Sequence, residues 1–431
     1  MFTERYRSHH DAEHHLNAAL GIAPRPNPVP WEEVEKKLNQ PPEGKPRGIY
    51  IHVPHCDRIC TFCNLNRRNR SGADLDSYTA YIIDEIKSYG AYPYIREQPF
   101  TAVYVGGGTP TVLDAKQLGR IVQTLKTHLP LSPDCEITLE STQHNLPAAK
   151  AAALEAEGVT RFSIGIQTFS GRGRTVLGRT YSGERAVDEL KALRSAFSGV
   201  LGIDLIYSYP GQTIEEAAFD AETCARLEVD SASFYSLMIQ GSSALAQSIA
   251  AGELAFDRDI EFDRERHHLI CLALKNAGFE LLELSKLARP GRDAYRYIRI
   301  RYENGDLLPI GSGAGGNIAG FPVYSMAPGR RFVSAPNPDY EKYYRILGLL
   351  QFGRYDPRDI AAQLGEAAKT VVREKIAEYA ARGFLEAKDG GSYCLSPEGI
   401  FWGNNIAVDM LQAVIAVDFA EVKKGIHQFE P

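Results

Sequence analysis

With 431 residues, 44% of them hydrophobic, the chain is too long for one ordinary compact domain and can bury a substantial core. Its formal net charge of −6 excludes the basic field that non-specific nucleic-acid binding requires, so we expect no nucleic-acid partner. No apolar run approaches the roughly 20 residues that span a bilayer, and no targeting segment is recognisable. We therefore expect a cytoplasmic, monomeric protein that does not enter the membrane.

Residues 1–46 are polar and proline-rich and are predicted to form an N-terminal extension. The extension contains four closely spaced histidines: His9, His10, His14 and His15. His10 and His14, four residues apart, would share a helix face, where they could ligate a metal or a haem. A solvated helix face is the simpler interpretation, because nothing else in the segment resembles a site.

Residues 47–335 contain β-rich runs that alternate with amphipathic helical stretches. The predicted strands are Ile49–Val53, Ala102–Val105, Glu136–Leu139, Arg161–Ile166, Leu201–Ile206 and Ala232–Leu237. Repeated β-then-α units predict an α/β fold whose parallel sheet closes partly or fully into a barrel. The functional residues of such barrels lie at the C-terminal ends of the strands.

Residues 336–431 show a different pattern, with helices followed by a short ribbon. Helices are predicted at Tyr340–Gln351, Asp356–Leu364 and Ala367–Arg382, and a hairpin from Phe384 to Leu395. This outline is typical of a winged helix. Because the charges of its third helix are balanced, we expect a cap that covers a substrate rather than a DNA reader.

Three cysteines lie within eight residues, in the run Cys56-Asp-Arg-Ile-Cys60-Thr-Phe-Cys63. Three thiolates on one short loop can hold three irons of a 4Fe-4S cluster and leave the fourth iron open to a ligand. A zinc site would need a fourth ligand, and although His52 and His55 are near, no second cysteine pair follows. A disulfide framework does not fit seven cysteines in a chain of this size. The isolated cysteines are predicted to be buried free thiols: Cys135, Cys224, Cys271 and Cys394.

Further polar and glycine residues follow the predicted strands at the same rim. An open iron calls for a small ligand with an amine and a carboxylate, and S-adenosylmethionine (SAM) has both. The turn Gly106-Gly-Gly-Thr-Pro110 lets the backbone approach such a head group closely. Hydrogen bonds to ribose, ammonium or carboxylate groups are available from Glu140, Gln167, Arg179 and Asp204. Each of these residues alone is equally compatible with a structural role.

The sequence resembles radical SAM enzymes of the group that contains oxygen-independent coproporphyrinogen dehydrogenase, over residues 47 to about 400. The motifs that carry the likeness are Tyr50-Ile-His-Val-Pro-His-Cys56, Cys60-Thr-Phe-Cys63, Gly106-Gly-Gly-Thr-Pro-Thr111, Ser163-Ile-Gly-Ile-Gln-Thr-Phe169, Gly178-Arg179, Ile203-Asp-Leu-Ile-Tyr-Ser-Tyr-Pro-Gly211 and Ala288-Arg-Pro-Gly291. In this group two SAM molecules can bind side by side. The resemblance implies that the first is lined by Tyr50, Gly107, Glu140 and Gly315. It implies that the second is lined by Phe62, Gly108, Thr109, Gln167, Arg179, Asp204 and Met238. Met238 and Gly315 stand where the family places other residues.

Several features separate the chain from two subgroups of this family. The coproporphyrinogen dehydrogenases carry a further cysteine two residues after the third, where this chain has Leu65. The haem chaperones begin almost at the first strand and have a histidine in the late loop, which here is Ile310-Gly-Ser-Gly-Ala-Gly-Gly316. That loop, the extension and the run Gln240-Gly-Ser-Ser-Ala-Leu245 are more similar to the haem-utilisation methyltransferases, which open the haem ring without oxygen.

The resemblance also implies a mechanism and an electron donor. Flavodoxin or ferredoxin would reduce the cluster, and the first SAM would split to a radical that takes a hydrogen from the methyl group of the second. The resulting methylene radical would add to an unsaturated carbon of haem or another tetrapyrrole. The protein would position the reactants and exclude water.

A porphyrin substrate would need a flat slot and cations for its propionates. One segment interleaves tyrosines with arginines at Arg289, Arg292, Arg296, Arg299 and Arg301. A salt-bridged surface segment explains it equally well. Two other functions share the cofactor motifs and stay open, namely a radical C-methyltransferase or cyclopropanase of a natural product and a cluster-bearing haem chaperone.

Overall fold

A computed structural model describes residues 2–22, 27–239, 241–256 and 259–427, so Gln240 of the run at 240–245 lies outside the described residues. The central feature is a twelve-stranded sheet with the order β14-β13-β12-β11-β1-β4-β5-β6-β7-β8-β10-β9. Its parallel core comprises β1 (Arg47–Val53), β4 (Phe100–Gly107), β5 (Leu131–Ser141), β6 (Arg161–Gln167), β7 (Val200–Tyr207), β8 (Ser231–Ser236) and β11 (Asp306–Ile310). The six predicted strands are all present, and the α/β barrel expectation is confirmed.

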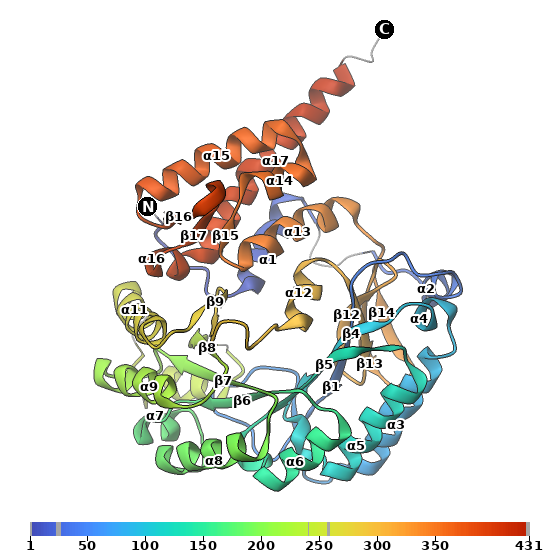
Figure 1. The fold of residues 1–431 in the computed structure, drawn as a ribbon, viewed down its shortest axis with the longest axis vertical. Coiled ribbons are helices and arrows are strands. Elements are labelled where there is room, and N and C mark those ends of the chain that lie inside the picture. The colour runs from blue at the N-terminus through green and yellow to red at the C-terminus, as the bar shows by residue number, and fades with distance from the viewer. Residues whose placement is uncertain (1, 23–26, 240, 257–258, 428–431) are drawn as a thin grey trace.

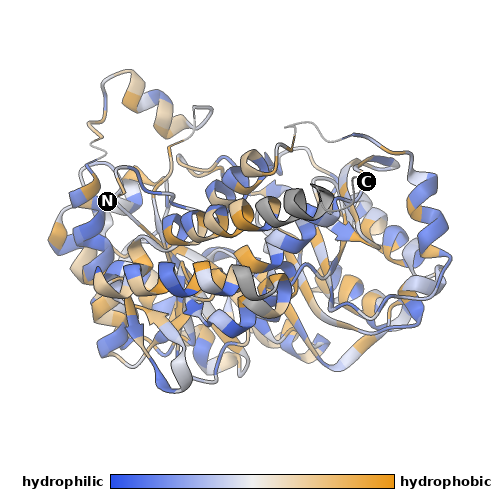
Figure 2. Cartoon of the chain, turned by 90° about the horizontal axis from the view of Figure 1, so that it is seen from above, coloured by the Kyte–Doolittle hydropathy of each residue, from blue (hydrophilic) through white to orange (hydrophobic). Residues whose placement is uncertain are grey.

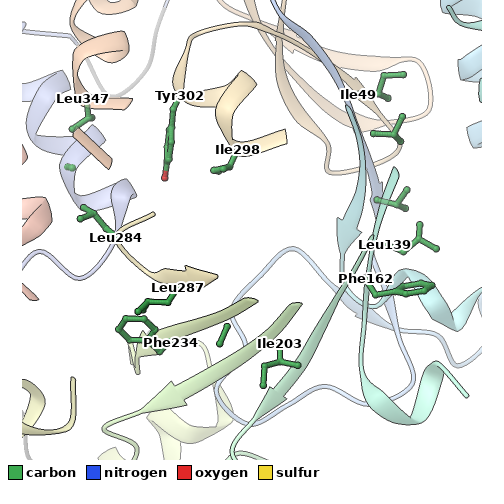
Figure 3. Packing of buried hydrophobic residues seen from close by; sticks show 14 of the residues in the cluster. Ile49, Leu139, Phe162, Ile203, Phe234, Leu284, Leu287, Ile298, Tyr302 and Leu347 are labelled. Atoms are coloured by element: carbon green, nitrogen blue, oxygen red, sulfur yellow. The ribbon is translucent and has the colours of Figure 1, made fainter. Parts of the chain in front are cut away.

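The strands of the core have one apolar face and one polar face. Along β1, Ile49, Ile51 and Val53 are fully buried, and Figure 3 shows Ile49 among the apolar side chains of the cluster. Side chains alternate between the two faces of a strand, so Tyr50 and His52 lie on the face opposite to these isoleucines. Tyr50 is the register partner of Tyr104 on β4, which places both hydroxyl-bearing rings on the concave side. The helices therefore cover the apolar face, while the concave face is left for chemistry.

Helices that follow the strands pack on the outer face of the curved sheet (Figure 1). They are α3 (Leu75–Tyr89), α4 (Pro93–Arg96), α5 (Ala115–His128), α6 (Ala148–Glu157), α7 (Gly171–Val176), α8 (Gly183–Ala196), α9 (Ile214–Arg226) and α11 (Ile260–Asn276). The short α10 (Ala244–Ala250) lies against the cysteine loop instead, where the Leu245 amide donates to the Thr61 carbonyl. Side-chain caps fix the N-terminal ends of several of these helices. At the start of α5, the Asp114 side chain accepts a hydrogen bond from the Gln117 amide, and the Gln117 side chain accepts one from the Asp114 amide.

Antiparallel strands extend both edges of the parallel core. One edge continues into β10 (Lys286–Ala288) and β9 (Glu280–Glu283), and the other into β12 (Gly315–Ile318), β13 (Phe321–Ala327) and β14 (Arg330–Val333). Between the two edges, α12 (Arg296–Tyr302) lies in the space between the sheet and the C-terminal helices (Figure 1). Figure 3 shows Ile298 and Tyr302 of α12 among the apolar side chains there.

The C-terminal elements are α13 (Pro338–Gln351), β15 (Arg354–Tyr355), α14 (Pro357–Leu364), α15 (Glu366–Ala381), β16 (Leu385–Ala387), β17 (Tyr393–Leu395), α16 (Pro397–Phe401) and α17 (Gly403–His427). The three predicted helices and the hairpin are all present. The small sheet has the order β15-β17-β16, as in a winged-helix outline.

The N-terminal segment is more integrated than an extension would be. It forms α1 (His9–Ala19) and α2 (Trp31–Leu38), and α1 packs against α13 and α17 with Ala12 and Leu16 buried. The Tyr6 amide donates to Asn405 Oδ1 over 2.9 Å, which ties the two ends of the chain together. The expectation of a solvated histidine face holds for His10 and His14, which are exposed, whereas His9 and His15 are partly buried.

Two further expectations concern the free cysteines and the membrane. All seven cysteines are free, and Cys135, Cys224 and Cys271 are buried as predicted. Cys394 is only partly buried, because it lies on the small β17 ribbon rather than in a packed layer. Figure 2 shows hydrophilic and hydrophobic residues mixed along the helices, and within the described residues no helix is long and apolar enough to cross a membrane.

Candidate functional site

The three-cysteine loop lies at the C-terminal end of β1, where the chain leaves the barrel. Cys56 ends the short strand β2 (His55–Cys56), which pairs in parallel with β3 (Arg68–Asn69), and the Cys63 amide donates to the Cys60 carbonyl over 3.2 Å. Cys56, Cys60 and Cys63 all line one pocket of about 190 Å³. The loop is therefore closed at its base and presents its three thiols to the same space.

Two glycines of the pocket lining lie too close to neighbouring atoms to carry a side chain. A Cβ on Gly108 would lie 2.9 Å from Cys56 Sγ and 2.7 Å from the His55 carbonyl oxygen. Gly107 has a φ of +116°, and a Cβ there would lie 2.7 Å from the His52 ring. Since side chains are excluded at both positions, the backbone itself forms the pocket wall.

The donor set fits a 4Fe-4S cluster with one open iron. Three thiols line the pocket, while no other cysteine of the described residues does. The two histidines considered as zinc ligands, His52 and His55, are not part of the lining, and the His52 nitrogens face the Tyr50 hydroxyl at 3.0 Å and the Asn66 carbonyl at 2.9 Å. A tetrahedral zinc site with either histidine is therefore not formed.

Hydrogen-bond donors surround the sulfur atoms. Burial raises the pKa of the Cys56 thiol, and a hydrogen bond from the Thr109 hydroxyl at 3.5 Å opposes that effect. Burial likewise raises the pKa of Cys63. Arg179 Nη1 donates to Cys60 Sγ over 3.3 Å. Metal binding deprotonates thiols, and such donors then stabilise the sulfur charge.

Glu140 connects the glycine turn to the interior of the barrel. Its carboxylate accepts hydrogen bonds from the Tyr104 hydroxyl at 2.7 Å and from the Gly107 amide at 3.0 Å. Burial raises its pKa, and the Tyr104 hydrogen bond opposes this. A Cβ on Gly106 would lie 2.8 Å from Glu140 Oε2, so the glycine makes room for the carboxylate.

The opposite side of the pocket comes from β6, β7 and the turn after α7. Gln167 has a φ of +71° at a bulge between β6 and β7, a strained conformation that is common at ligand sites. Asp204 accepts a hydrogen bond from the Ser163 hydroxyl at 3.3 Å, and Arg179 donates to the Gly165 carbonyl. Gln167, Asp204 and Arg179 all line the pocket.

The structure brings most of the predicted site residues together. Besides the cysteines, the pocket is lined by Phe62, Gly107, Gly108, Thr109, Glu140, Gln167, Arg179 and Asp204. Tyr50, Gly315 and Met238 are not in this lining. Tyr50 lies deeper, stacked on Tyr104 with ring centroids 6.3 Å apart, Gly315 lies on β12, and Met238 is 40% exposed beyond β8. The lining also contains three residues that the sequence analysis did not select, namely Arg67, Gln143 and His144. Arg67 closely follows the last cysteine of the loop and the other two follow the end of β5, and these positions could have indicated them as site residues.

The five arginines predicted to hold propionates do not converge. Arg292 pairs with Asp230 before β8, and Arg296 pairs with Asp134 at the start of β5, so both lie at the opposite end of the barrel from the cysteines. Arg289 donates to the Leu227 and Val229 carbonyls. Arg299 is exposed and donates to the Ala294 carbonyl, and Arg301 pairs with Glu13. The geometry does not favour a propionate clamp, because the five guanidinium groups each have a different partner.

Comparison with known proteins agrees with this geometry. Residues 50–223 match the radical SAM superfamily. The chain is 29% identical to anaerobilin synthase of Escherichia coli O157:H7 over 91% of this chain and 89% of that protein. It is 30% identical to heme chaperone HemW of Mycobacterium tuberculosis (strain ATCC 25618 / H37Rv), over 64% of this chain and 71% of that protein.

A solved structure shares the fold. Coproporphyrinogen III oxidase (HemN) from Escherichia coli superposes with a TM-score of 0.73 at 21% identity, covering 89% of this chain and 93% of that chain. Together with the three-cysteine pocket, these similarities give the family: the chain belongs to the radical SAM superfamily, in the group that includes HemN and HemW.

Proposed function

We propose that the protein is a radical SAM C-methyltransferase that uses two SAM molecules to methylate haem, open its ring without oxygen and release its iron. The observation that supports this most is the gathering of Gln167, Arg179 and Asp204 with the three-cysteine loop around one pocket. By resemblance these residues bind a second SAM. A protein that binds one SAM, or that only carries haem, has no need for all three.

The similarity to anaerobilin synthase supports the haem substrate. It extends over 91% of the chain at 29% identity, and the similarity to HemW proteins extends over 64–84% at 22–30% identity. The late loop without histidine and Leu65 in place of a fourth cysteine are further points against the chaperone and the dehydrogenase subgroups.

The residues of the pocket have separable roles in this proposal. When bound, the cluster and SAM supply the radical chemistry. Gly107 and Gly108 admit a head group to the backbone, and Glu140, held by Tyr104, accepts hydrogen bonds from a ribose or an ammonium group. Arg179 offers its guanidinium to a carboxylate. Flavodoxin or ferredoxin is proposed as the electron donor.

The pocket alone is small for two cofactors. Its volume of about 190 Å³ is below the roughly 300–1,000 Å³ typical of small-molecule sites. Tyr50 and Gly315, assigned by resemblance to the first SAM, lie outside this pocket. We therefore propose that the first SAM extends from the pocket toward Tyr50 and β12.

The test is anaerobic turnover of reconstituted protein with methyl-deuterated SAM and haem. Deuterium in 5′-deoxyadenosine, a methylated tetrapyrrole and released iron are the expected products. Undeuterated 5′-deoxyadenosine together with intact haem would refute the proposal.

A haem chaperone is the second candidate, favoured by the similarity to HemW proteins. It would bind haem stoichiometrically and hand it over intact, with no methylated product. If haem neither bound nor reacted, a radical methyltransferase acting on a natural product would become the leading function.

A further inference from the structure

A second cavity, of about 1190 Å³, lies between α1, α12, α13 and the β11–β12 edge of the sheet. Building on the proposed function, we infer that this cavity binds the haem macrocycle and that His14 is the axial ligand of its iron. The volume exceeds the range of roughly 300–1,000 Å³ that accommodates typical small ligands. A tetrapyrrole therefore has room here that the cysteine pocket does not offer.

The lining suits a flat, largely apolar ring. Tyr297, Tyr340 and Tyr344 contribute aromatic faces, and Tyr340 stacks on Tyr344 with ring centroids 5.4 Å apart and an interplanar angle of 26°. Gly315 and Gly316 of β12 contribute bare backbone. Offset stacking on aromatic rings and close approach to glycine are both available to a planar macrocycle.

One face of α1 supplies the polar part of the lining. Glu13, His14, Asn17 and Ala18 all line the cavity, as expected for residues three and four apart on a helix. His14 is exposed, and among the described residues its ring contacts only His15, edge-on with ring centroids 6.1 Å apart. Its nitrogens are thus available, and imidazole is the commonest protein ligand of haem iron.

Glu13, next to His14, is already engaged. It accepts hydrogen bonds from Arg301 at 2.9 Å and from the Tyr344 hydroxyl at 3.3 Å. Burial would raise its pKa, but a hydrogen bond from His10 and the charge of Arg301 lower it to about 2. Of the five arginines between residues 289 and 301, only Arg301 is among the described residues that line the cavity. It forms an ion pair with Glu13 and is therefore not a free cation. We therefore assign haem recognition to the aromatic and glycine lining and to the His14 imidazole, and not to an arginine clamp.

Two stacked tyrosine rings and the Glu140 carboxylate connect the cavity to the cysteine pocket. Tyr297 lines the cavity and stacks on Tyr104 with centroids 4.6 Å apart, and Tyr104 donates to Glu140, which lines the cysteine pocket. Gly315, assigned by resemblance to the first SAM, lines the cavity as well. A macrocycle in this cavity therefore lies next to the place where the proposed cofactor would end.

The test is an anaerobic haem titration of the full-length, cluster-reconstituted protein, read by the Soret band and by electron paramagnetic resonance of ferric haem. Ala18→Trp fills the cavity, and its control is Ala19→Trp, because Ala19 is also exposed at the end of α1 but is not in the lining. His14→Ala removes the ligand, and its control is His10→Ala, one turn earlier on the same helix.

We expect Ala18→Trp to weaken haem affinity by about tenfold or more and Ala19→Trp by less than about twofold. We expect His14→Ala, but not His10→Ala, to abolish the nitrogen-ligated spectrum. Wild-type affinity and spectrum in both Ala18→Trp and His14→Ala would overturn the inference while leaving the proposed function intact. If wild-type protein itself bound no haem, the haem substrate of the proposed function would fall, and this inference with it.

Discussion

At the C-terminal ends of the strands, Arg179, Asp204 and Gln167 face an open pocket, whereas at the N-terminal ends Arg161 and Arg292 are held by carboxylates. Arg161 and Asp293 are both about 1% exposed or less, with guanidinium–carboxylate contacts of 3.0 and 3.1 Å. The difference shows that an arginine-rich segment does not by itself indicate an anion site. What matters is whether the protein already supplies each guanidinium with its partner.

The largest expected effect is at the cysteine loop. Cys60→Ala should abolish the visible absorbance of the cluster and all SAM cleavage, because each thiolate holds one iron. Iron content, sulfide content and 5′-deoxyadenosine formation are the measurements. Cys394→Ala removes a free cysteine of β17 that does not line the pocket and should leave all three unchanged. A full iron complement in Cys60→Ala would contradict the cluster assignment.

The next effect concerns the second cofactor. Asp204→Ala and Arg179→Ala should still cleave SAM but lose methyl transfer, since no methyl donor would be held in reach. The readout is the ratio of methylated product to 5′-deoxyadenosine. Because Arg179 also donates to Cys60 Sγ, iron content is measured in parallel. Arg292→Ala is the control from the opposite barrel end, and methylation at wild-type rate in both pocket variants would refute the two-cofactor proposal.

At the opposite end, the buried pair should matter for stability rather than chemistry. Asp293→Asn should lower the free energy of unfolding by about 3–5 kcal/mol, because it leaves the buried Arg161 without its counter-charge. Denaturant midpoints measure this. Asp134→Asn, whose carboxylate is 67% exposed in its pair with Arg296, should leave the denaturant midpoint close to that of the wild type, because solvent screens this pair.

The same pair predicts a direction for the pH dependence of stability. Burial would raise the pKa of Asp293, but the charge and hydrogen bonds of Arg161 hold it well below its usual range. A depressed carboxyl pKa contributes stability above the unfolded value of about 4, and that contribution is lost as the pH falls toward the folded value. Wild-type protein should therefore lose stability below about pH 4 more steeply than Asp293→Asn. Equal acid profiles would show that the pair does not contribute.

The smallest expected effect is at Arg292. Its side chain is 55% exposed in the pair with Asp230, so Arg292→Ala should change stability by no more than about 1 kcal/mol. Haem affinity should stay within about twofold of wild type. A large loss of haem affinity would restore the propionate clamp that the geometry does not support.

The barrel strands were predictable because each is a local apolar run bounded by turn residues. The predicted strand Leu201–Ile206 lies within β7 (Val200–Tyr207), for example. The antiparallel extensions on both edges and α12 were not predicted. The sequence of α12, Arg-Tyr-Ile-Arg-Ile-Arg-Tyr, mixes arginine, tyrosine and isoleucine. Its helix starts after Tyr295, which has a φ of +44° and whose amide donates a hydrogen bond to Asp293 over 3.0 Å.

The sequence alone determined the cluster loop and the glycine turn, because three thiols within eight residues and three consecutive glycines constrain the local chain whatever surrounds them. Tertiary structure alone decided which polar groups stay free. Glu13 meets Arg301 288 residues along the chain, and this pairing places α1 beside α12 and α13, where the second cavity forms. Contacts over such separations depend on the packing of whole elements, which no local pattern encodes.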